Sequence, residues 1–361
     1  MRSTFFAGEN VLEAQKAPTR RTGETDRQVD SVSELVVQDL RMYYQSRRGQ
    51  VRAVDGVSFT LAPGKALGIV GESGCGKSSL GITLLRLLPP NGRVMGGSVR
   101  LGGEELLTMD EETFRKSIRW KKLAMVFQGA MNALNPVLTV GSQIAEAILA
   151  HERVTKEEAE RRAKDLLAMV GINPARYGHY PHEFSGGMKQ RAVIAMALAC
   201  NPQVIIADEP TTALDVMVQA QVLKAISDLR QRLGLSLILV SHDLSVVAQT
   251  CDEVAVMYAG KIVEHGPVEE VLVRPRHPYT QGLTQAFPDI RADRAPIVSI
   301  PGTPPNLLSP PSGCRFHPRC PLADELCVRE EPELVEKGSA RHRVACHQVS
   351  VSGEVAEVRF A

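Results

Sequence analysis

The chain has 361 residues, more than an ordinary domain of about 100–200 residues, so we expect two structural units, the larger with a full-sized core. Hydrophobic residues make up 43% and charged residues 23% of the sequence, which is typical of a soluble globular protein. Lys and Arg (42) nearly balance Asp and Glu (41), so there is no broad basic field, which argues against nucleic-acid binding as the main activity.

The apolar runs are short. Those at residues 204–207 and 237–240 fall far below the roughly 20 residues that cross a bilayer, and the first 15 residues lack the apolar stretch of a signal peptide. The sequence therefore predicts a cytoplasmic chain without a membrane span.

In chain order, residues 1–33 are polar and predict a flexible tail. Alternating runs from Leu35 predict an antiparallel sheet ahead of a first buried strand. A helical stretch then runs over about 141–168, with Ala, Ile and Leu on one side. Three near-continuous apolar runs follow, at 204–207, 235–240 and 254–257. Together with the first buried strand at 66–70, they predict a parallel sheet covered on both faces. Proline becomes dense from about Arg291 and marks a linker to a cysteine-rich end.

The strongest motif is Gly71–Ser78, which reads GESGCGKS between the apolar run ALGIV and the helical run SLGITLLRLL. It matches the P-loop pattern G-x-x-x-x-G-K-[ST] in its strand–turn–helix context. Backbone N–H groups and the helix N-terminus bind phosphate there, and we expect Lys77 to reach the β- and γ-phosphates and Ser78 to bind Mg²⁺. The candidate nucleotide ligands are Gly71, Ser73, Gly74, Cys75, Gly76, Lys77, Ser78 and Ser79.

A second motif is the apolar run VIIA followed by Asp208 and Glu209. A carboxylate at the end of a parallel strand beside a P-loop can hold the Mg²⁺ shell, and we assign this role to Asp208. An adjacent second carboxylate is costly in repulsion, so we predict that Glu209 is the general base that polarises the attacking water.

Between these motifs lie Gln128 and the segment FSGGMKQ, which opens a helix running to about Cys200. Ser185 is a good N-cap, and Gly186 and Gly187 expose N–H groups at a second helix start, which is again an anion site. Because one chain holds one γ-phosphate, this second site is predicted to serve the nucleotide of a neighbouring subunit.

Together with the sequences ALD at 213–215 and SHD at 241–243, these motifs resemble the nucleotide-binding subunits of ATP-binding-cassette (ABC) transporters over about residues 35–288. The runs HPYTQGL and CRFHPRCP narrow the resemblance to the oligopeptide/dipeptide importer branch. The resemblance implies an α/β P-loop NTPase fold with a RecA-like core, an antiparallel β-subdomain and a helical subdomain. It implies a tail (1–33), an ATPase domain (34–290, helical subdomain about 135–190) and a C-terminal extension (291–361).

The resemblance also implies roles for single residues. Tyr44 is the aromatic that stacks on adenine, with Tyr43 as its rival. Gln128 senses Mg²⁺ and the attacking water, and His242 contacts the γ-phosphate. Ser185, Gly186 and Gly187 form the signature that closes over ATP on the opposite subunit, and Asp215 lies at the dimer seam.

Two departures from the family pattern bear on the partners. The signature reads FSGGM instead of LSGGQ, which resembles one of two paralogous ATPases and favours a heterodimer over a homodimer. The loop after Gln128 reads GAMNALNP, where many relatives have an aspartate and proline, and this departure leaves the identity of the permease, and so the cargo, open.

Cys314, Cys320, Cys327 and Cys346 gather near the C-terminus. Four thiolates in a reducing compartment suit a [4Fe–4S] cluster or Zn²⁺; the resemblance favours iron–sulfur, and unligated buried thiols are the third alternative. Nearby His317, His342 and His347 are alternative ligands. A structural staple is favoured over a redox sensor, because the short extension has little core of its own.

The sequence thus predicts a peripheral ATPase at the cytoplasmic face of the membrane that uses ATP and Mg²⁺ to power import of peptides. Its expected partners are a paralogous ATPase, two permease subunits and, indirectly, an extracytoplasmic solute-binding protein. Nickel chelates or short glycans are alternative cargoes. The rival functions are a soluble ABC ATPase acting on ribosomes or DNA, and a scaffold that binds nucleotide without hydrolysing it.

Overall fold

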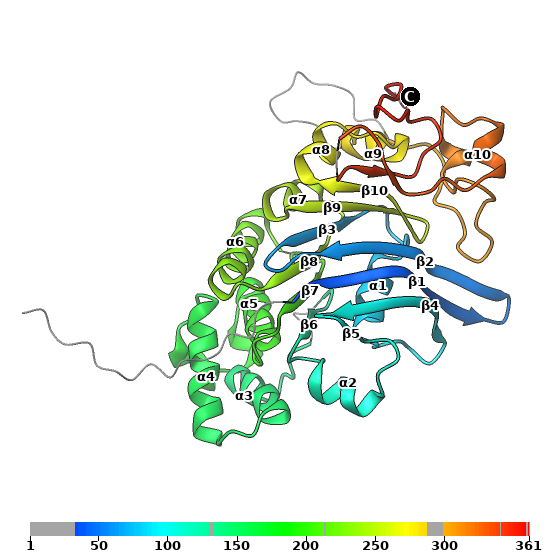
Figure 1. Ribbon diagram of the computed structural model, residues 1–361. Coiled ribbons are helices and arrows are strands. Elements are labelled where there is room, and N and C mark those ends of the chain that lie inside the picture. The colour runs from blue at the N-terminus through cyan, green and yellow to red at the C-terminus, as the bar shows by residue number, and fades with distance from the viewer. Residues whose placement is uncertain are drawn as a thin grey trace, which may run out of the picture. The chain divides into compact units, whose positions relative to one another are not determined.

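The computed structural model describes residues 33–129, 133–212, 214–286, 299–339, 341–358 and 360, which belong to one compact unit (Figure 1). Nearly all of the predicted tail (1–33), part of the loop after Gln128, Ala213 of the ALD sequence and most of the linker around residue 291 lie outside the described residues.

The strands of the described residues form two sheets. The smaller sheet consists of β1 (Leu35–Ser46), β2 (Gly49–Leu61), β4 (Gly92–Leu101) and β5 (Glu104–Glu105). The larger sheet consists of β3 (Ala66–Val70), β6 (Leu123–Val126), β7 (Val204–Asp208), β8 (Ser236–Val240), β9 (Glu253–Tyr258), β10 (Lys261–Pro267), β11 (Val335–Glu336) and β12 (Arg343–Val344).

The smaller sheet has the order β2-β1-β4-β5 and is antiparallel throughout, which confirms the sequence prediction. The larger sheet has the order β11-β12-β10-β9-β3-β8-β7-β6, and its strands from β9 to β6 run parallel. The carboxyl ends of these parallel strands therefore meet at one edge, where a ligand site is expected.

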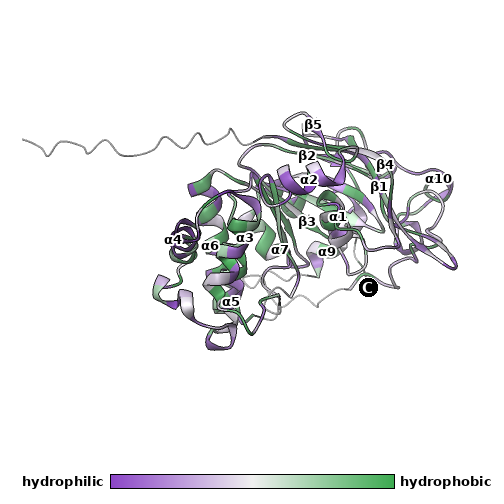
Figure 2. Ribbon diagram, turned by 90° about the horizontal axis from the view of Figure 1, so that it is seen from below, coloured by the Kyte–Doolittle hydropathy of each residue, from purple (hydrophilic) through white to green (hydrophobic). Residues whose placement is uncertain are grey.

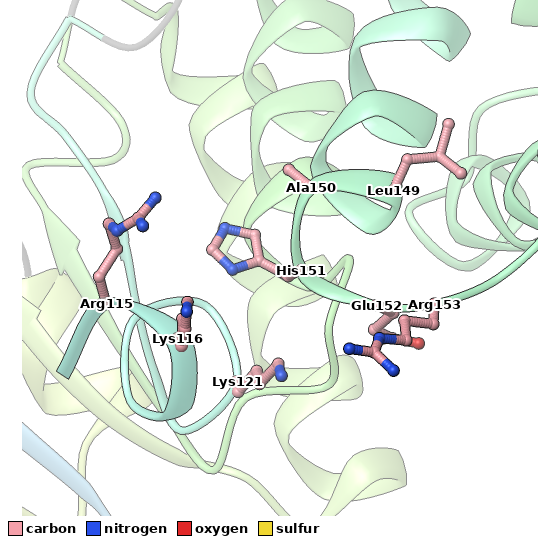
Figure 3. Close-up of a pocket in the computed structure, with 8 residues that line it drawn as sticks. All are labelled: Arg115, Lys116, Lys121, Leu149, Ala150, His151, Glu152 and Arg153. Atoms are coloured by element: carbon pink, nitrogen blue, oxygen red, sulfur yellow. The ribbon is translucent and has the colours of Figure 1, made fainter. Parts of the chain in front are cut away.

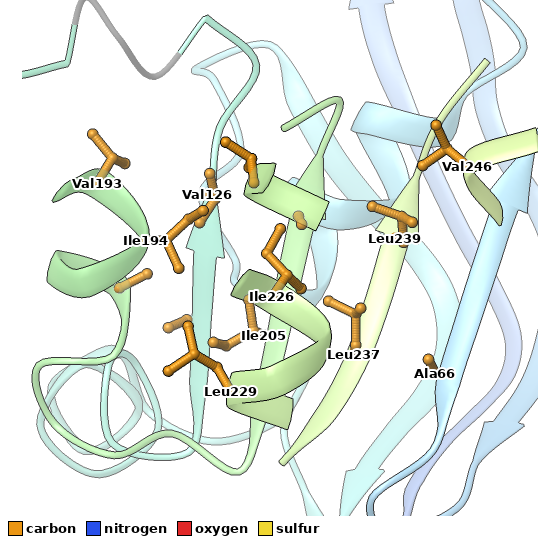
Figure 4. Close-up of a cluster of buried hydrophobic side chains, with 14 of the residues drawn as sticks. Ala66, Val126, Val193, Ile194, Ile205, Ile226, Leu229, Leu237, Leu239 and Val246 are labelled. Atoms are coloured by element: carbon orange, nitrogen blue, oxygen red, sulfur yellow. The ribbon is translucent and has the colours of Figure 1, made fainter. Parts of the chain in front are cut away.

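Two hydrophobic cores lie on opposite faces of the larger sheet because side chains alternate along a strand. On β7, Ile205 and Ala207 face the core that the helices cover, whereas Val204 and Ile206 face the core shared with the antiparallel sheet. Figure 4 shows Ile205 and Leu237 pointing toward helical side chains such as Leu229. Every residue of β7 is buried, which explains the unbroken apolar sequence.

The helices cover both faces of the sheet (Figures 1 and 2). The longer ones are α1 (Lys77–Leu84), α2 (Glu111–Ser117), α3 (Val140–His151), α4 (Lys156–Met169), α5 (Gly186–Ala197), α6 (Val216–Leu233), α7 (Leu244–Thr250) and α9 (Pro278–Gln285). The shorter ones are α8 (Val268–Val273), α10 (Glu325–Arg329) and the 3₁₀ turns η2 (Pro174–Gly178), η3 (Pro181–Glu183) and η4 (His317–Arg319).

The continuous helix predicted over 141–168 is in fact two helices. Glu152 at the end of α3 takes an extended backbone conformation, and the Thr155 side chain accepts a hydrogen bond from the Glu158 N–H to begin α4. A Thr N-cap starts a new helix, so the chain turns back and the two helices pack together as the start of the helical region.

The cysteine-rich segment joins the larger sheet. Its strand β12 pairs with β10, and β11 pairs with β12. His342 beside β12 and Glu264 on β10 are both fully buried, and His342 Nε2 lies 2.7 Å from Glu264 Oε1. The segment after residue 299 therefore packs as part of the same compact unit.

Candidate functional site

The loop between β3 and α1 has the backbone of an anion-binding cradle. Gly71, Gly74 and Gly76 all take positive φ angles, a conformation that glycine adopts at little cost. A Cβ at Gly71 would collide with the Met257 carbonyl oxygen, and one at Gly76 with the Ala53 carbonyl oxygen. Only glycine fits these two positions. The loop they shape leads into the start of α1, whose N–H groups can bind phosphate.

Lys77 is buried within this loop. Its Nζ donates hydrogen bonds to the carbonyl oxygens of Gly71 at 2.7 Å and of Glu72 at 3.0 Å. The ammonium group is therefore held in the loop by the backbone, where its charge can meet a bound anion.

The loop opens into a cavity of about 510 Å³. The cavity is lined by Tyr44, Val51, Ala53, Ser73, Gly74, Gly76, Lys77, Ser78, Ser79, Gln128, Glu209, His242 and Leu307. Ten of these lining residues were predicted from the sequence, so the structure brings together residues that are up to about 200 positions apart.

Tyr44 lines the cavity, and its hydroxyl lies 3.0 Å from Ser79 Oγ. The rival Tyr43 instead donates a hydrogen bond to Asp55 Oδ1 at 2.5 Å, and burial together with this contact raises its pKa. Of the two tyrosines only Tyr44 is placed to contact a ligand in this cavity.

Asp208 ends strand β7 and is buried. Burial raises the pKa of its carboxyl, opposed by a hydrogen bond from Ser78. Its Oδ1 atom is buried without a hydrogen-bond partner among the described residues. A buried carboxylate oxygen of this kind, beside a hydroxyl, fits the hard oxygen donors that Mg²⁺ requires, so the side chains of Ser78 and Asp208 fit the ion.

Glu209 lines the cavity and contacts three other side chains. Its Oε2 accepts hydrogen bonds from Gln128 Nε2 at 2.7 Å and from Thr212 Oγ1 at 3.0 Å, and its Oε1 lies 3.1 Å from His242 Nδ1. Gln128 follows β6, Glu209 follows β7 and His242 follows β8. The carboxyl ends of neighbouring parallel strands thus place an amide, a carboxylate and an imidazole in contact.

The predicted signature lies elsewhere. Ser185 Oγ accepts a hydrogen bond from the Met188 N–H at 3.3 Å and caps α5, while a Cβ at Gly187 would collide with Val218 on α6. Ser185 and Gly186 are exposed, and neither they nor Gly187 lines the cavity. The structure therefore does not bring the signature and the P-loop together within one chain.

Asp215 precedes α6, which packs against α5, the helix that begins at the signature. Its Oδ1 accepts a hydrogen bond from the Val218 N–H at 3.0 Å and caps α6. The next two side chains, Val216 and Met217, are 80% and 73% exposed. An apolar pair at a helix start is unusual on a free surface.

The four cysteines at the C-terminal end are free and at least half-buried. Burial, and to a lesser extent the neighbouring cysteines, raise the pKa of the Cys314 thiol to about 11 and of Cys320 to about 12, and the pKa of Cys346 is also raised. Within the described ranges, no three His, Cys, Asp or Glu side chains are arranged to hold a metal ion. The iron–sulfur or zinc site therefore stays a prediction.

The three alternative histidine ligands have other partners. His317 Nδ1 lies 2.9 Å from the Cys314 carbonyl oxygen, and His347 Nε2 lies 3.0 Å from the Glu330 carbonyl oxygen. His342 contacts Glu264. None of these contacts involves a cysteine sulfur.

Sequence reasoning missed several residues around the cavity. Leu307, Val51 and Ala53 line it, and Tyr279 of the HPYTQGL run accepts a hydrogen bond from the Glu72 N–H at 2.8 Å. The signal in the sequence for such contacts is the presence of the HPYTQGL and CRFHPRCP runs far from the P-loop.

A second cavity, of about 640 Å³, lies between the end of α2 and the end of α3 (Figure 3). Basic side chains dominate its lining, which consists of Arg115, Lys116, Lys121, Leu149, Ala150, His151, Glu152 and Arg153. Burial and the charges of Lys121 and Arg115 lower the pKa of His151. None of the predicted site residues belongs to this cavity.

Two family models match the chain. One, described as ABC transporter, matches residues 54–212, and the other, described as the C-terminal region of oligopeptide/dipeptide transporters, matches residues 263–327. No helix in the described part of the chain is both long and apolar enough to cross a membrane.

Among curated proteins, the probable peptide ABC transporter ATP-binding protein y4tR of Sinorhizobium fredii is 48% identical over 316 residues, which cover 86% of this chain and 94% of that protein. The oligopeptide transport ATP-binding protein OppD of Salmonella typhimurium is 46% identical over 300 residues, covering 82% and 89%.

Among solved structures, the dimeric post-hydrolysis state of the ATP-binding cassette MJ0796 bound to ADP and Pi is similar, with a TM-score of 0.58 and 27% identity over 65% of this chain and 98% of that chain. The structure of cbiO1 from Clostridium perfringens has the same TM-score at 26% identity, covering 66% and 90%.

Proposed function

The chain belongs to the ATP-binding subunits of ABC transporters for peptides and oligopeptides, and from this premise we propose that it binds ATP in the 510 Å³ cavity and hydrolyses it to power import of di- or oligopeptides. The observation that carries the proposal is the Gln128–Glu209–His242 cluster, which faces the P-loop across that cavity.

The phosphates would bind to the backbone N–H groups of the loop and to Lys77, with the base against Tyr44. Ser78 and Asp208 would hold Mg²⁺, and the orphaned Oδ1 of Asp208 supports this assignment. When bound, the ion supplies positive charge that offsets the charge of the phosphates.

Glu209 would orient and polarise the attacking water as general base. Gln128 holds one of its oxygens at 2.7 Å, and His242 lies beside the other. These two contacts fix the carboxylate at the mouth of the P-loop. A fixed carboxylate suits phosphoryl transfer to water, because this reaction depends on positioning more than on new covalent chemistry.

A second subunit would complete the site. The separation of Ser185–Gly187 from the cavity supports a composite site in which each signature serves the opposite nucleotide. Exposed Val216 and Met217 beside Asp215 supply an apolar seam for that partner. We propose a paralogous ATPase as the partner, with a homodimer as the alternative.

The membrane subunits would dock near the loop after Gln128. Phe127, Val137 and Leu138 are 43%, 75% and 40% exposed, and apolar side chains gathered in one loop favour a protein contact. The chain would then be a peripheral protein at the inner face of the membrane. The division at about residue 290 between ATPase domain and extension belongs to the same proposal.

The test is Glu209→Gln, which keeps the shape of the side chain and removes the base. We expect the hydrolysis rate to fall by about a hundredfold or more, while MgATP binding, measured by titration of a fluorescent ATP analogue, stays within about twofold of wild type. Thr60→Ser, on the antiparallel sheet away from the cavity, is the control. Near-wild-type turnover by Glu209→Gln would contradict the base assignment.

We further propose that Cys314, Cys320, Cys327 and Cys346 bind an iron–sulfur cluster, with Zn²⁺ as the alternative. The support is chemical: four buried or half-buried thiols lie near one end of the sequence, and thiolates are the ligands of both groups. The present side-chain arrangement is not itself a metal site, so no step of the ATPase reaction is assigned to the cluster.

Anaerobic purification followed by iron, sulfide and zinc analysis tests this proposal. We expect about four iron atoms and four sulfides per chain, lost in Cys320→Ser and retained in Cys251→Ser, which alters a half-buried thiol outside the group. A folded, metal-free wild-type chain would overturn it.

A further inference from the structure

The segment after residue 299 reaches the P-loop through Arg319. The Nη1 and Nη2 atoms of Arg319 donate hydrogen bonds to the two carboxylate oxygens of Glu72 at 2.7 and 2.9 Å. The Arg319 side chain is 6% exposed and that of Glu72 is 24% exposed. This is a bidentate pair in a mostly buried setting, the geometry in which arginine binds carboxylate most strongly.

Other contacts hold the guanidinium in place. Arg319 Nε donates to the Pro301 carbonyl oxygen at 2.8 Å, and Nη1 lies 3.3 Å from the Tyr258 hydroxyl. The guanidinium also lies near the rings of Tyr258 and Phe316. Arg319 is therefore fixed by its own segment and presents its charge to Glu72.

Glu72 links this contact to the phosphate-binding groups. It is the second residue of the P-loop, its carbonyl oxygen accepts a hydrogen bond from Lys77 Nζ, and its N–H donates to the Tyr279 hydroxyl. A carboxylate at this position would repel a triphosphate in the same loop. The positive charge of Arg319 offsets that repulsion and holds the residue whose carbonyl orients Lys77.

The same segment also touches the other end of the cavity. Leu307 lines it together with Tyr44 and Val51, and the Leu307 carbonyl oxygen accepts a hydrogen bond from the Arg52 N–H at 3.0 Å. The turn at Leu307 therefore packs against β2, on the side of the cavity where Tyr44 would meet the base.

We propose that residues 299–319 are a working part of the nucleotide site, in which Arg319 positions the P-loop by neutralising Glu72 and Leu307 covers the base side of the cavity. This inference rests on the proposed ATP binding and adds to it two residues that lie outside the ABC transporter match at 54–212. Arg319 is a positioning residue, because it acts through Glu72.

The first experiment measures the affinity of the full-length chain for a fluorescent ATP analogue with Mg²⁺, and KM and kcat for ATP. We expect Arg319→Ala to raise Kd and KM about tenfold, with kcat changed less than about threefold, because an uncompensated carboxylate repels the triphosphate. Adding Glu72→Gln to Arg319→Ala should restore most of the lost affinity. Loss of a purely structural arginine would lower the melting temperature, because Glu72 would be left as an unpaired, mostly buried carboxylate, and would leave the Kd of the folded chain for ATP unchanged.

Arg315→Ala is the matched control. Arg315 is as buried as Arg319 and lies four residues away in the same segment, but it pairs with Asp55 and the Ala259 carbonyl oxygen instead of the P-loop. We expect it to lower the melting temperature without a tenfold change in Kd. The inference is overturned if Arg319→Ala binds ATP within twofold of wild type, if the double variant is no better than Arg319→Ala, or if Arg315→Ala raises Kd equally.

The second experiment separates the two residues by competition with inorganic tripolyphosphate, which has no base. Leu307→Ala should weaken ATP binding about threefold or more and leave tripolyphosphate binding unchanged, whereas Arg319→Ala should weaken both. Equal binding of ATP by Leu307→Ala and wild type would remove Leu307 from the site. A wild-type chain that binds neither ATP nor tripolyphosphate would overturn the proposed function itself, a result distinct from all of these.

Discussion

At the scale of single residues, Glu209 is held in a conformation that its side chain does not favour. Its φ angle is +45°, which costs a non-glycine residue about 1–2 kcal/mol. Its N–H donates a hydrogen bond to the Val240 carbonyl oxygen at 2.9 Å, and its carboxylate accepts from Gln128 and Thr212. These contacts offset the strain, and the turn aims the carboxylate into the cavity instead of along the strand.

Asp208 and Glu209 are adjacent and yet differ in environment. Asp208 is buried, with a raised pKa that burial causes, while Glu209 lies among three side-chain partners at the mouth of the cavity. One carboxylate thus faces the hydroxyl of Ser78, and the other faces the polar groups that would surround a water molecule. Two adjacent acidic residues can therefore serve two tasks, because the strand ends between them.

At the scale of elements, the start of α9 depends on a neutral histidine. His277 is almost fully buried, and its Nδ1 accepts a hydrogen bond from the Tyr279 N–H at 3.0 Å, which caps the helix. Burial lowers the pKa of His277 to about 3, below the value of about 6.5 for an unfolded chain. Protonation would remove the acceptor that begins α9 and place a charge in the core.

The unfolded chain therefore takes up this proton first as the pH falls. The contribution of neutral His277 to stability is complete above about pH 6.5 and is lost between about pH 6.5 and 3, at up to about 1.4 kcal/mol per pH unit. We expect His277→Asn, which keeps an N-cap acceptor, to lose about 2 kcal/mol less stability than wild type between pH 7 and 5. Urea denaturation at a series of pH values measures this difference.

Exposed His182 provides the control for that measurement. His182→Asn removes an imidazole from the surface and should leave the pH dependence of stability as in wild type. A parallel pH dependence for His277→Asn and wild type would contradict the assignment of this acid sensitivity to the cap of α9.

At the scale of the whole molecule, the sequence predicted best what is local or periodic. The P-loop and the Asp208–Glu209 pair lie within short motifs. The antiparallel sheet followed from alternating apolar residues, and the parallel sheet followed from near-continuous apolar runs. The break between α3 and α4 was missed because a Thr N-cap inside a helical pattern competes with continuation of the helix. The pairing of Arg319 with Glu72 joins positions 247 residues apart, and no spacing rule reaches that far.

The proposed dimer of two ATPase subunits can be tested at the exposed apolar side chains beside Asp215. Met217 is 73% exposed beside Asp215, and a charge placed in an apolar seam is costly once the seam closes. In a Glu209→Gln background with MgATP, we expect Met217→Glu to weaken dimer formation by about tenfold or more. Light scattering after size-exclusion chromatography measures the fraction of dimer, both for the chain alone and for the chain with a co-expressed second ATPase of the family.

Val273→Glu is the matched control, because Val273 is 75% exposed at the end of α8, away from Asp215. It should leave dimer formation unchanged, and both variants should bind the fluorescent ATP analogue as the parent does.

A dimer that forms with the second ATPase but not with the chain alone would select the heterodimer, because only the paralogous signature would then complete the site. Equal dimer formation by Met217→Glu and Val273→Glu would place the seam elsewhere, and a chain that hydrolyses ATP at full rate as a strict monomer would contradict the composite site.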